Sequence, residues 1–236
     1  MLHDFKEEWD LRSYVESQLR DILETAKYFH GHICPFLALG IKASTIAMNK
    51  LGIGRLSFDE SVEERILAIV ECNNCFTDGV QVATGCTLGN NCLVYIDLGK
   101  NAVTLVRRSS WEGVRVYIDA KKLREEYFPK EALDLFERII ARREGNKEDG
   151  KALSRIWEEL GYKMLKIPDE EFKIETVKVA PIEGAPIFES IRCESCGELA
   201  MATRISHISG KPYCLKCAGK RYHAVIGRGI VELGEE

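Results

Sequence analysis

Nine cysteines and five histidines supply the strongest candidates for chemistry in this sequence. Four of the cysteines form two CxxC pairs near the C-terminal end, Cys193 with Cys196 and Cys214 with Cys217. The spacing of the pairs predicts that four thiolates bind one structural zinc ion in a zinc ribbon or a treble clef. Two redox-active pairs are the alternative, but they do not explain why all four thiols lie in one short, turn-rich segment.

A second group of metal-binding residue types lies in the segment His30-Gly31-His32-Ile33-Cys34-Pro35. Pro35 suits the first position of a helix, so Cys34 would lie at a helix N-terminus, where a thiolate is stabilised. Such a thiolate suits metal binding or nucleophilic attack. Polar groups whose hydrogen bonds are satisfied at a packed turn are the alternative interpretation.

About forty residues later, Cys75, Asp78 and Gln81 follow one another at three-residue steps, which places them on one face of a helix. Together with the histidine and cysteine segment they could close a site of imidazole, thiolate and carboxylate groups. A site with fewer than four protein ligands leaves a position for water or substrate, which is typical of catalytic rather than structural zinc.

Three further cysteines lie near this second segment. Cys72 could be another ligand or a resolving thiol, although a small buried cysteine is the more common role. Cys86, in the sequence Thr84-Gly85-Cys86-Thr87, and Cys92 are interpreted mainly as packing residues near the site.

Helices are predicted to position both halves of this site. Over Glu8–Tyr28 apolar residues recur at helical steps, and this helix leads to His30. The recurring residues are Leu11, Tyr14, Val15, Leu19, Ile22, Leu23 and Ala26. A second helix should run from Pro35 to about Lys50. A buried strand over Ile66–Val70 leads into the second segment, and a short helix over Phe76–Thr84 follows it.

The rest of the first domain is predicted to form a sheet and two more helices. Leu93–Asp97 and Ala102–Val106 flank a turn and predict a β-hairpin, which a strand over Val114–Ile118 joins. Helical spacing follows over Pro129–Arg143 and again over Leu153–Leu160. The fold class is therefore α+β, with helices packed on a mainly antiparallel sheet.

Three prolines between residues 166 and 190 indicate an extended connector. The predicted organisation is a core domain over residues 1–165, the connector over 166–190, and a small treble-clef-like zinc finger over 191–236. The finger is too small to fold on an apolar core of its own, so we expect metal binding to supply much of its folding free energy. His207 and His223 are not needed as ligands beside four thiolates.

The composition narrows the class of protein. The 236 residues carry 33 Lys and Arg against 37 Asp and Glu, a net charge of −4, which gives no reason to expect a nucleic-acid partner. No window is apolar enough for a membrane span and the first residues show no signal peptide, so we expect a soluble cytoplasmic protein without membrane association. No GxGxxG or Walker sequence indicates nucleotide binding.

Several segments resemble a known family. HGHICPFLALGIKAS, CFTDGVQVATGCTLGNN and YIDLGKNAVTLVRR are similar to signatures of the FmdE family, which is named for the E subunit of formylmethanofuran dehydrogenase. RCESCGELA with GKPYCLKC resembles the zinc-finger extension of some members. The resemblance covers most of residues 25–120 and 191–217. It implies an α+β core followed by a treble-clef-like finger, often in an intertwined homodimer.

The family's site residues carry over onto His32 and Cys34 of the HGHxCP motif and onto Cys75 and Asp78 of the CxxDGVQ motif. We therefore expect His32, Cys34 and Cys75 to bind a second metal ion, zinc, in the core. Asp78 would orient a ligand or move a proton, which makes Cys34, Cys75 and Asp78 the candidate catalytic residues.

Thr84 and Cys86 of the TGCT motif lie near this site by the same resemblance. Cys72 and Cys92 occupy positions where the family pattern leads us to expect other residue types, so a thiol-based variation of the site stays open.

The resemblance favours a metal-binding protein linked to redox or one-carbon metabolism. The family name refers to genes beside molybdenum formylmethanofuran dehydrogenase, which reduces carbon dioxide onto methanofuran in methanogenesis, and members also occur where that pathway is absent. The chemistry could be metal-assisted hydrolysis or a thiolate-dependent step on a small-molecule substrate that the sequence does not identify.

Two other readings remain. A non-catalytic accessory protein would bind a molybdenum or tungsten enzyme, or its pterin cofactor. A transcriptional regulator would act through the finger, where basic residues outnumber acidic ones between Ile191 and Gly229. This local charge is equally consistent with the solvated outside of a zinc module, which we favour.

Overall fold

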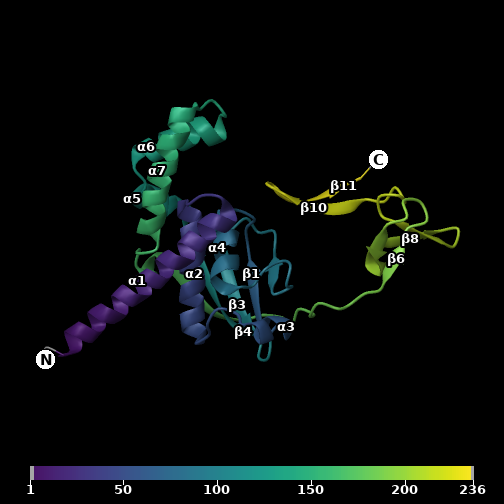
Figure 1. The fold of residues 1–236 in the computed structure, drawn as a ribbon, viewed down its shortest axis with the longest axis horizontal. Helices are drawn as coiled ribbons and strands as arrows, with labels where there is room; N and C mark the ends of the chain where they lie inside the picture. Colours follow the sequence, from purple (N-terminus) through teal and green to yellow (C-terminus); the bar gives the residue numbers. More distant parts are fainter. Residues whose placement is uncertain (1–2, 235–236) are drawn as a thin grey trace. The chain divides into compact units, whose positions relative to one another are not determined.

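The computed structural model describes residues 3–234, with side chains described from residue 17 onward. The chain divides into two compact units between Pro181 and Ile182 (Figure 1). The predicted apolar positions Leu11, Tyr14 and Val15 lie outside the described side chains, although the backbone there is helical.

The first unit is built on a five-stranded sheet with the order β2-β1-β3-β4-β5. The strands are β1 (Ile66–Val70), β2 (Leu93–Tyr95), β3 (Ala102–Arg107), β4 (Glu112–Ile118) and β5 (Phe172–Lys178). All neighbouring pairs are antiparallel except β1 with β2. The predicted α+β class with a mainly antiparallel sheet is confirmed.

Three helices form the layer that carries the predicted core site. They are α1 (His3–His30), α2 (Pro35–Leu51) and α4 (Cys75–Thr84), which contact one another, and α2 and α4 also contact the strands of the sheet (Figure 1). Leu23 and Ala26 of α1 are buried against this layer, as the helical spacing predicts. All five residues of β1 are buried beneath it.

The ends of α2 and α4 follow the predicted capping chemistry. Pro35 opens α2, and Gly52 ends it in the left-handed conformation with φ of 62°. Asn74 caps α4, where its side-chain oxygen accepts a hydrogen bond from the Phe76 amide at 2.9 Å. These caps place Cys34 immediately before α2 and Cys75 at the first position of α4.

Further helices complete the first unit. They are α3 (Phe58–Val62), α5 (Ala120–Tyr127), α6 (Lys130–Phe136) and α7 (Lys147–Met164), together with a π-helical turn over Glu137–Ala141 and a 3₁₀ turn over Asp169–Glu171. Helix α7 packs on α2 and α6. The predicted helices over 129–143 and 153–160 correspond to α6 with its π-helical turn and to α7, whereas α3 and α5 were not predicted.

The predicted hairpin of residues 93–97 with 102–106 is wrong. Strand β2 instead pairs in parallel with β1, and β3 pairs with the opposite edge of β1. Strand β1 is apolar on both faces and fully buried, so a neighbour on each side satisfies its backbone groups. The Lys100 amide donates to the Glu71 carbonyl oxygen at 2.9 Å, which ties the loop after β2 to the end of β1.

The core unit also extends beyond the predicted boundary at residue 165. Residues 172–178, placed in the predicted connector, form the edge strand β5 and pair with β4 over its full length. The sequence FKIETVK alternates apolar and polar side chains, which is typical of a half-buried strand, with Phe172 buried and Ile174 packed against the core.

The second unit consists of short β-hairpins. Strand β6 (Ser190–Arg192) pairs with β7 (Leu199–Met201), β8 (Ile205–Ile208) with β9 (Lys211–Cys214), and β10 (Tyr222–Ile226) with β11 (Gly229–Leu233). A 3₁₀ turn over Ala202–Arg204 links the first two hairpins.

No helix in the described part of the chain is both long enough and apolar enough to cross a membrane.

Candidate metal centre and adjoining cavity

Three helix ends bring a histidine and two cysteines together. His30 is the last residue of α1, Cys34 caps α2, and Cys75 begins α4. One ligand atom from each of these residues lies within 4.8 Å of the others. Gly31, with φ of 94°, turns the chain between the first two residues. The predicted thiols Cys34 and Cys75 are therefore brought together, with His30 as the imidazole beside them.

The His30 ring is fixed by an acid from α4. Its Nδ1 atom lies 2.6 Å from Oδ2 of Asp78, and Gln81 donates to the other carboxylate oxygen of Asp78 at 3.3 Å. The Nε2 atom of His30 is buried and has no hydrogen-bond partner among the described residues. Since a buried polar nitrogen without a partner is costly, this atom is well suited to bind a metal ion.

His32, which the sequence suggested as the ligand, lies outside this cluster. Its ring centroid is 4.6 Å from that of His30, and its other neighbour is Trp157, stacked at 5.7 Å. Burial and the adjacent His30 lower the pKa of His32, which favours the neutral ring. Nothing in the sequence motif HGH distinguishes its two histidines; only the position of Asp78 in space does.

The two core thiols have opposite shifts in pKa. The Cys34 thiol donates a hydrogen bond to Cys75, which lowers the pKa of Cys75 to about 6, and the nearby His30 lowers it further. The same hydrogen bond, together with burial, raises the pKa of Cys34. The pair therefore readily carries one negative charge, which is the state that binds a cation.

The other cysteines of the first unit have packing environments. Cys72, Cys86 and Cys92 are buried, and burial raises the pKa of each, that of Cys86 to about 12. The Cys72 thiol donates to the side-chain oxygen of Asn74 at 3.6 Å. Thr84 is also buried, where its hydroxyl donates to the Val80 carbonyl oxygen at 2.7 Å and accepts from the Cys86 amide. None of these residues belongs to the cluster of His30, Cys34 and Cys75.

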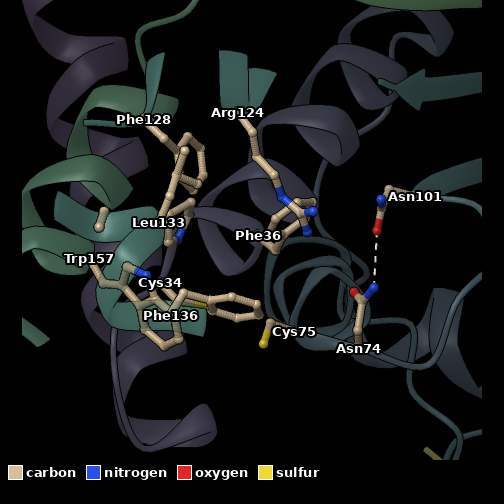
Figure 2. Close-up of a pocket in the computed structure, with 12 residues that line it drawn as sticks. Cys34, Phe36, Asn74, Cys75, Asn101, Arg124, Phe128, Leu133, Phe136 and Trp157 are labelled. Carbon is tan, nitrogen blue, oxygen red and sulfur yellow. Dashed lines mark hydrogen bonds between the residues drawn. The ribbon is translucent and has the colours of Figure 1, made fainter. Parts of the chain in front are cut away.

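A cavity of about 230 Å³ opens beside the two thiols (Figure 2). Most of its lining is apolar, and four of the lining side chains are aromatic. The lining residues are Cys34, Pro35, Phe36, Asn74, Cys75, Asn101, Arg124, Phe128, Ala132, Leu133, Phe136 and Trp157. The side chains from α6 and α7 lie on one side, and Asn74 and Asn101 lie on the other, joined by a hydrogen bond of 3.0 Å. Helices α5 to α7 thus contribute lining residues that the sequence analysis did not identify.

The four C-terminal cysteines converge in the second unit. The side-chain sulfur atoms of Cys193, Cys196, Cys214 and Cys217 all lie within 4.8 Å of one another. Tight turns after Cys193 and Cys214 direct backbone amides toward these sulfurs, and the amide of Cys196 lowers the pKa of Cys193 to about 6. Two turns that each offer two thiolates to one point are the geometry of a tetrahedral zinc site.

The sequence of the second unit matches a zinc-finger family over this region. Residues 186–223 match the prokaryotic dksA/traR C4-type zinc finger. The predicted C-terminal zinc finger with its four-cysteine cluster is confirmed.

Residues 29–173, which contain the histidine, both thiols, Asp78 and all but the end of the sheet, match the family described as FmdE, molybdenum formylmethanofuran dehydrogenase operon. The chain belongs to the FmdE family. The match ends within β5, so the FmdE region corresponds to most of the first unit and excludes the finger.

A solved structure has the same fold. It is the crystal structure of an FmdE-like protein of the tungsten formylmethanofuran dehydrogenase type from Syntrophus aciditrophicus, with a TM-score of 0.55 and 26% sequence identity. The alignment covers 85% of this FmdE-family chain and 92% of that protein.

A curated relative is much more similar in sequence. A protein of Archaeoglobus fulgidus named "Probable S-adenosyl-L-methionine-binding protein" is 61% identical over 228 residues. The alignment covers 97% of the FmdE-family chain described here but only 60% of the relative, so the chain spans about three fifths of that protein's length.

Proposed function

We propose that this FmdE-family protein holds a reactive metal ion in its core and performs metal-dependent chemistry on a small molecule in redox or one-carbon metabolism. One observation carries the proposal. The Nδ1 atom of His30 is held by Asp78, while its buried Nε2 atom, close to two thiols, has no partner among the described residues. A carboxylate, a histidine and a metal ion in series are a recurrent arrangement in metal sites.

The residues present fit a zinc ion or a similar soft divalent cation. His30, Cys34 and Cys75 would hold it, and two thiolates with one imidazole leave a fourth position open, as in catalytic zinc sites. Such an ion would supply a Lewis acid that polarises a bound oxygen or lowers the pKa of bound water.

The protein's own side chains prepare this site. Asp78 fixes the tautomer of His30 with the proton on Nδ1, and Gln81 holds the Asp78 carboxylate in place. The stacked His32 and Trp157 rings cover one side of His30. These contacts keep the imidazole from rotating and exclude water from one side of the ring.

The metal content of purified variants tests this assignment. We expect about two metal ions per chain in the wild type, one in each unit, and about one in each of His30→Ala, Cys34→Ser and Cys75→Ser. Cys72→Ser is the matched control, because it removes a buried thiol outside the cluster and should keep both ions.

His32→Ala separates the two histidines, and it should retain the core metal ion. Loss of that ion in His32→Ala with retention in His30→Ala would contradict the assignment. About one ion per chain in every protein, including the wild type, would leave only the finger occupied and refute the core centre.

An accessory role is the second candidate. The family description refers to a molybdenum formylmethanofuran dehydrogenase operon, and the name of the structural neighbour refers to a tungsten formylmethanofuran dehydrogenase. In this role the chain, as a homodimer, would bind a molybdenum or tungsten enzyme. Co-purification of such an enzyme with the tagged chain supports it, and catalytic turnover by the isolated chain counts against it.

The name of the Archaeoglobus relative raises S-adenosyl-L-methionine as a candidate ligand. The matched region spans 60% of that relative, so this binding could reside in either part of the longer protein. Isothermal titration calorimetry with S-adenosyl-L-methionine decides for this chain. Saturable binding assigns the property to the FmdE and finger regions, and no heat of binding assigns it to the remainder of the relative.

A further inference from the structure

The cavity beside the thiols leads inward from the surface. Arg124 of α5 is exposed, whereas Cys34 is 3% exposed. Figure 2 shows the Arg124 side chain reaching toward the ring of Phe36, with Cys34 and Cys75 on the other side of that ring. A molecule that enters past Arg124 therefore approaches the two thiols.

The lining of the cavity favours a flat ligand. Trp157, Phe136 and Phe36 present aromatic rings to it, and Phe136 is still 37% exposed. One face of Trp157 is stacked on His32, which fixes the orientation of the indole. Aromatic rings held in place by their neighbours bind planar conjugated molecules best through offset or edge-to-face contacts.

The charge of the lining favours an anion. Arg124 is the only residue among those lining the cavity with a permanent charge, and within the described chain it makes no ion pair. Its guanidinium lies 5.8 Å from the centre of the Phe36 ring, which leaves its N–H groups available. An Arg with free N–H groups at the mouth of an apolar cavity is suited to a carboxylate or a similar oxyanion.

A second donor lies across the cavity. Asn74 donates to Oδ1 of Asn101, which directs the amide of Asn101 so that its Nδ2 atom remains a donor. That Nδ2 atom has no hydrogen-bond partner among the described residues. A ligand oxygen could therefore accept from Asn101 while the oxyanion binds Arg124.

We infer that the cavity binds the substrate of the core site, and that this substrate is a small planar aromatic or conjugated molecule bearing a carboxylate or comparable oxyanion. Its ring packs against Trp157 and Phe136, its anionic group binds Arg124, and its other end reaches Cys34 and Cys75. A volume of about 230 Å³ is below the roughly 300–1,000 Å³ of sites for drug-sized ligands, so the cavity takes a small molecule or one end of a larger one. This inference rests on the metal centre proposed above.

Calorimetric titration with three probes tests the inference. They are 2-naphthoate, the neutral 2-naphthamide of the same shape, and adamantane-1-carboxylate, which has the charge without the flat ring. We expect 2-naphthoate to bind about tenfold more tightly than either of the other two, because charge-assisted hydrogen bonds to an Arg and ring packing both contribute.

Arg124→Gln should abolish the preference for 2-naphthoate over 2-naphthamide. Arg155→Gln is the matched control, because Arg155 is an exposed arginine of α7 outside the lining, and it should bind like the wild type. Trp157→Leu should weaken both naphthalene probes equally. Thermal unfolding of each variant verifies that it is folded.

Four results would overturn the inference: no binding of any probe, equal binding of acid and amide, equal binding of the adamantane acid, or equal losses in the two arginine variants. Metal analysis of the same samples separates the two proposals. Arg124-dependent binding in protein with only finger metal would refute the metal centre and keep the ligand class. A filled core site without probe binding would do the reverse.

Discussion

Gly40 of α2 and Gly79 of α4 face each other where the two helices cross. A Cβ atom on Gly40 would lie 3.2 Å from the Cα of Gly79 and only 2.0 Å from the Phe76 carbonyl oxygen. A Cβ on Gly79 would lie 2.2 Å from the Leu37 carbonyl oxygen. The absence of both side chains lets the helix backbones touch, and this contact brings the helix starts that carry Cys34 and Cys75 together.

Gly79→Ala should therefore damage the fold and the core site at the same time. A clash with backbone cannot be relieved by rotating a side chain, so we expect a loss of at least about 2 kcal/mol in the free energy of unfolding. Urea denaturation measures it, and metal analysis should show loss of the core ion with the finger ion retained.

Gly150→Ala is the control for this helix-crossing contact. Gly150 lies in α7, where an added Cβ meets nothing within 4 Å, so alanine should stabilise the helix by about 0.5–1 kcal/mol. Equal effects of the two substitutions would mean that the crossing of α2 and α4 tolerates a side chain.

Asp78→Asn should weaken core metal binding without removing a ligand. The variant retains the size of the side chain but loses the charge that holds Nδ1 of His30 at 2.6 Å, and loss of such a supporting carboxylate costs about 10–100-fold in affinity. Competition with a chelator measures the change. Asp59→Asn, on the exposed surface of α3, should leave the affinity unchanged; unaltered binding in Asp78→Asn would show that Asp78 does not support the metal ion.

Cys75 should be the first of the five cysteines of the first unit to react with iodoacetamide in metal-free protein. Its pKa is lowered to about 6, so the thiolate is already the main form at neutral pH, and the rate should level off above about pH 7. Burial raises the pKa of Cys72, Cys86 and Cys92, which keeps these thiols protonated.

Peptide mass spectrometry at a series of pH values measures the reaction, and added zinc should protect Cys75. A rate that continues to rise through about pH 8–9, as for an ordinary thiol, would contradict the lowered pKa.

Glu71→Ala should destabilise the sheet near the site. The Glu71 carboxylate, 5% exposed, accepts two hydrogen bonds from Arg115, from Nε at 2.6 Å and from Nη2 at 2.8 Å. Its removal leaves a half-buried guanidinium with Glu175 alone, so we expect a loss of about 3 kcal/mol by urea denaturation. Glu175→Ala breaks the more exposed pair and should cost less than about 1 kcal/mol. Similar losses for both would show that the burial of Glu71 does not matter.

Local patterns in the sequence were sufficient for the helices and for the finger. The cap residues Pro35, Gly52 and Gly85 mark helix ends through the conformations that they favour, and these ends lie where they were predicted. The two CxxC pairs identify their site because four thiolates so close along the chain can bind one ion with only short turns between them. In each case the physical cause acts within a few residues.

Contacts between distant segments decided the rest. The pairing of β2 with β1 and the place of β5 in the sheet depend on which strand edge is free after the core has packed, which no short window of sequence records. The choice of His30 over His32 depends on Asp78, 48 residues further along the chain, and on the glycine contact that brings α4 against α2. The sequence by itself thus determined the residue types of the metal sites and the helices that carry them, because those follow from local chemistry. Only the tertiary structure decided which histidine meets the thiols and which aromatic side chains line the cavity, because those follow from packing.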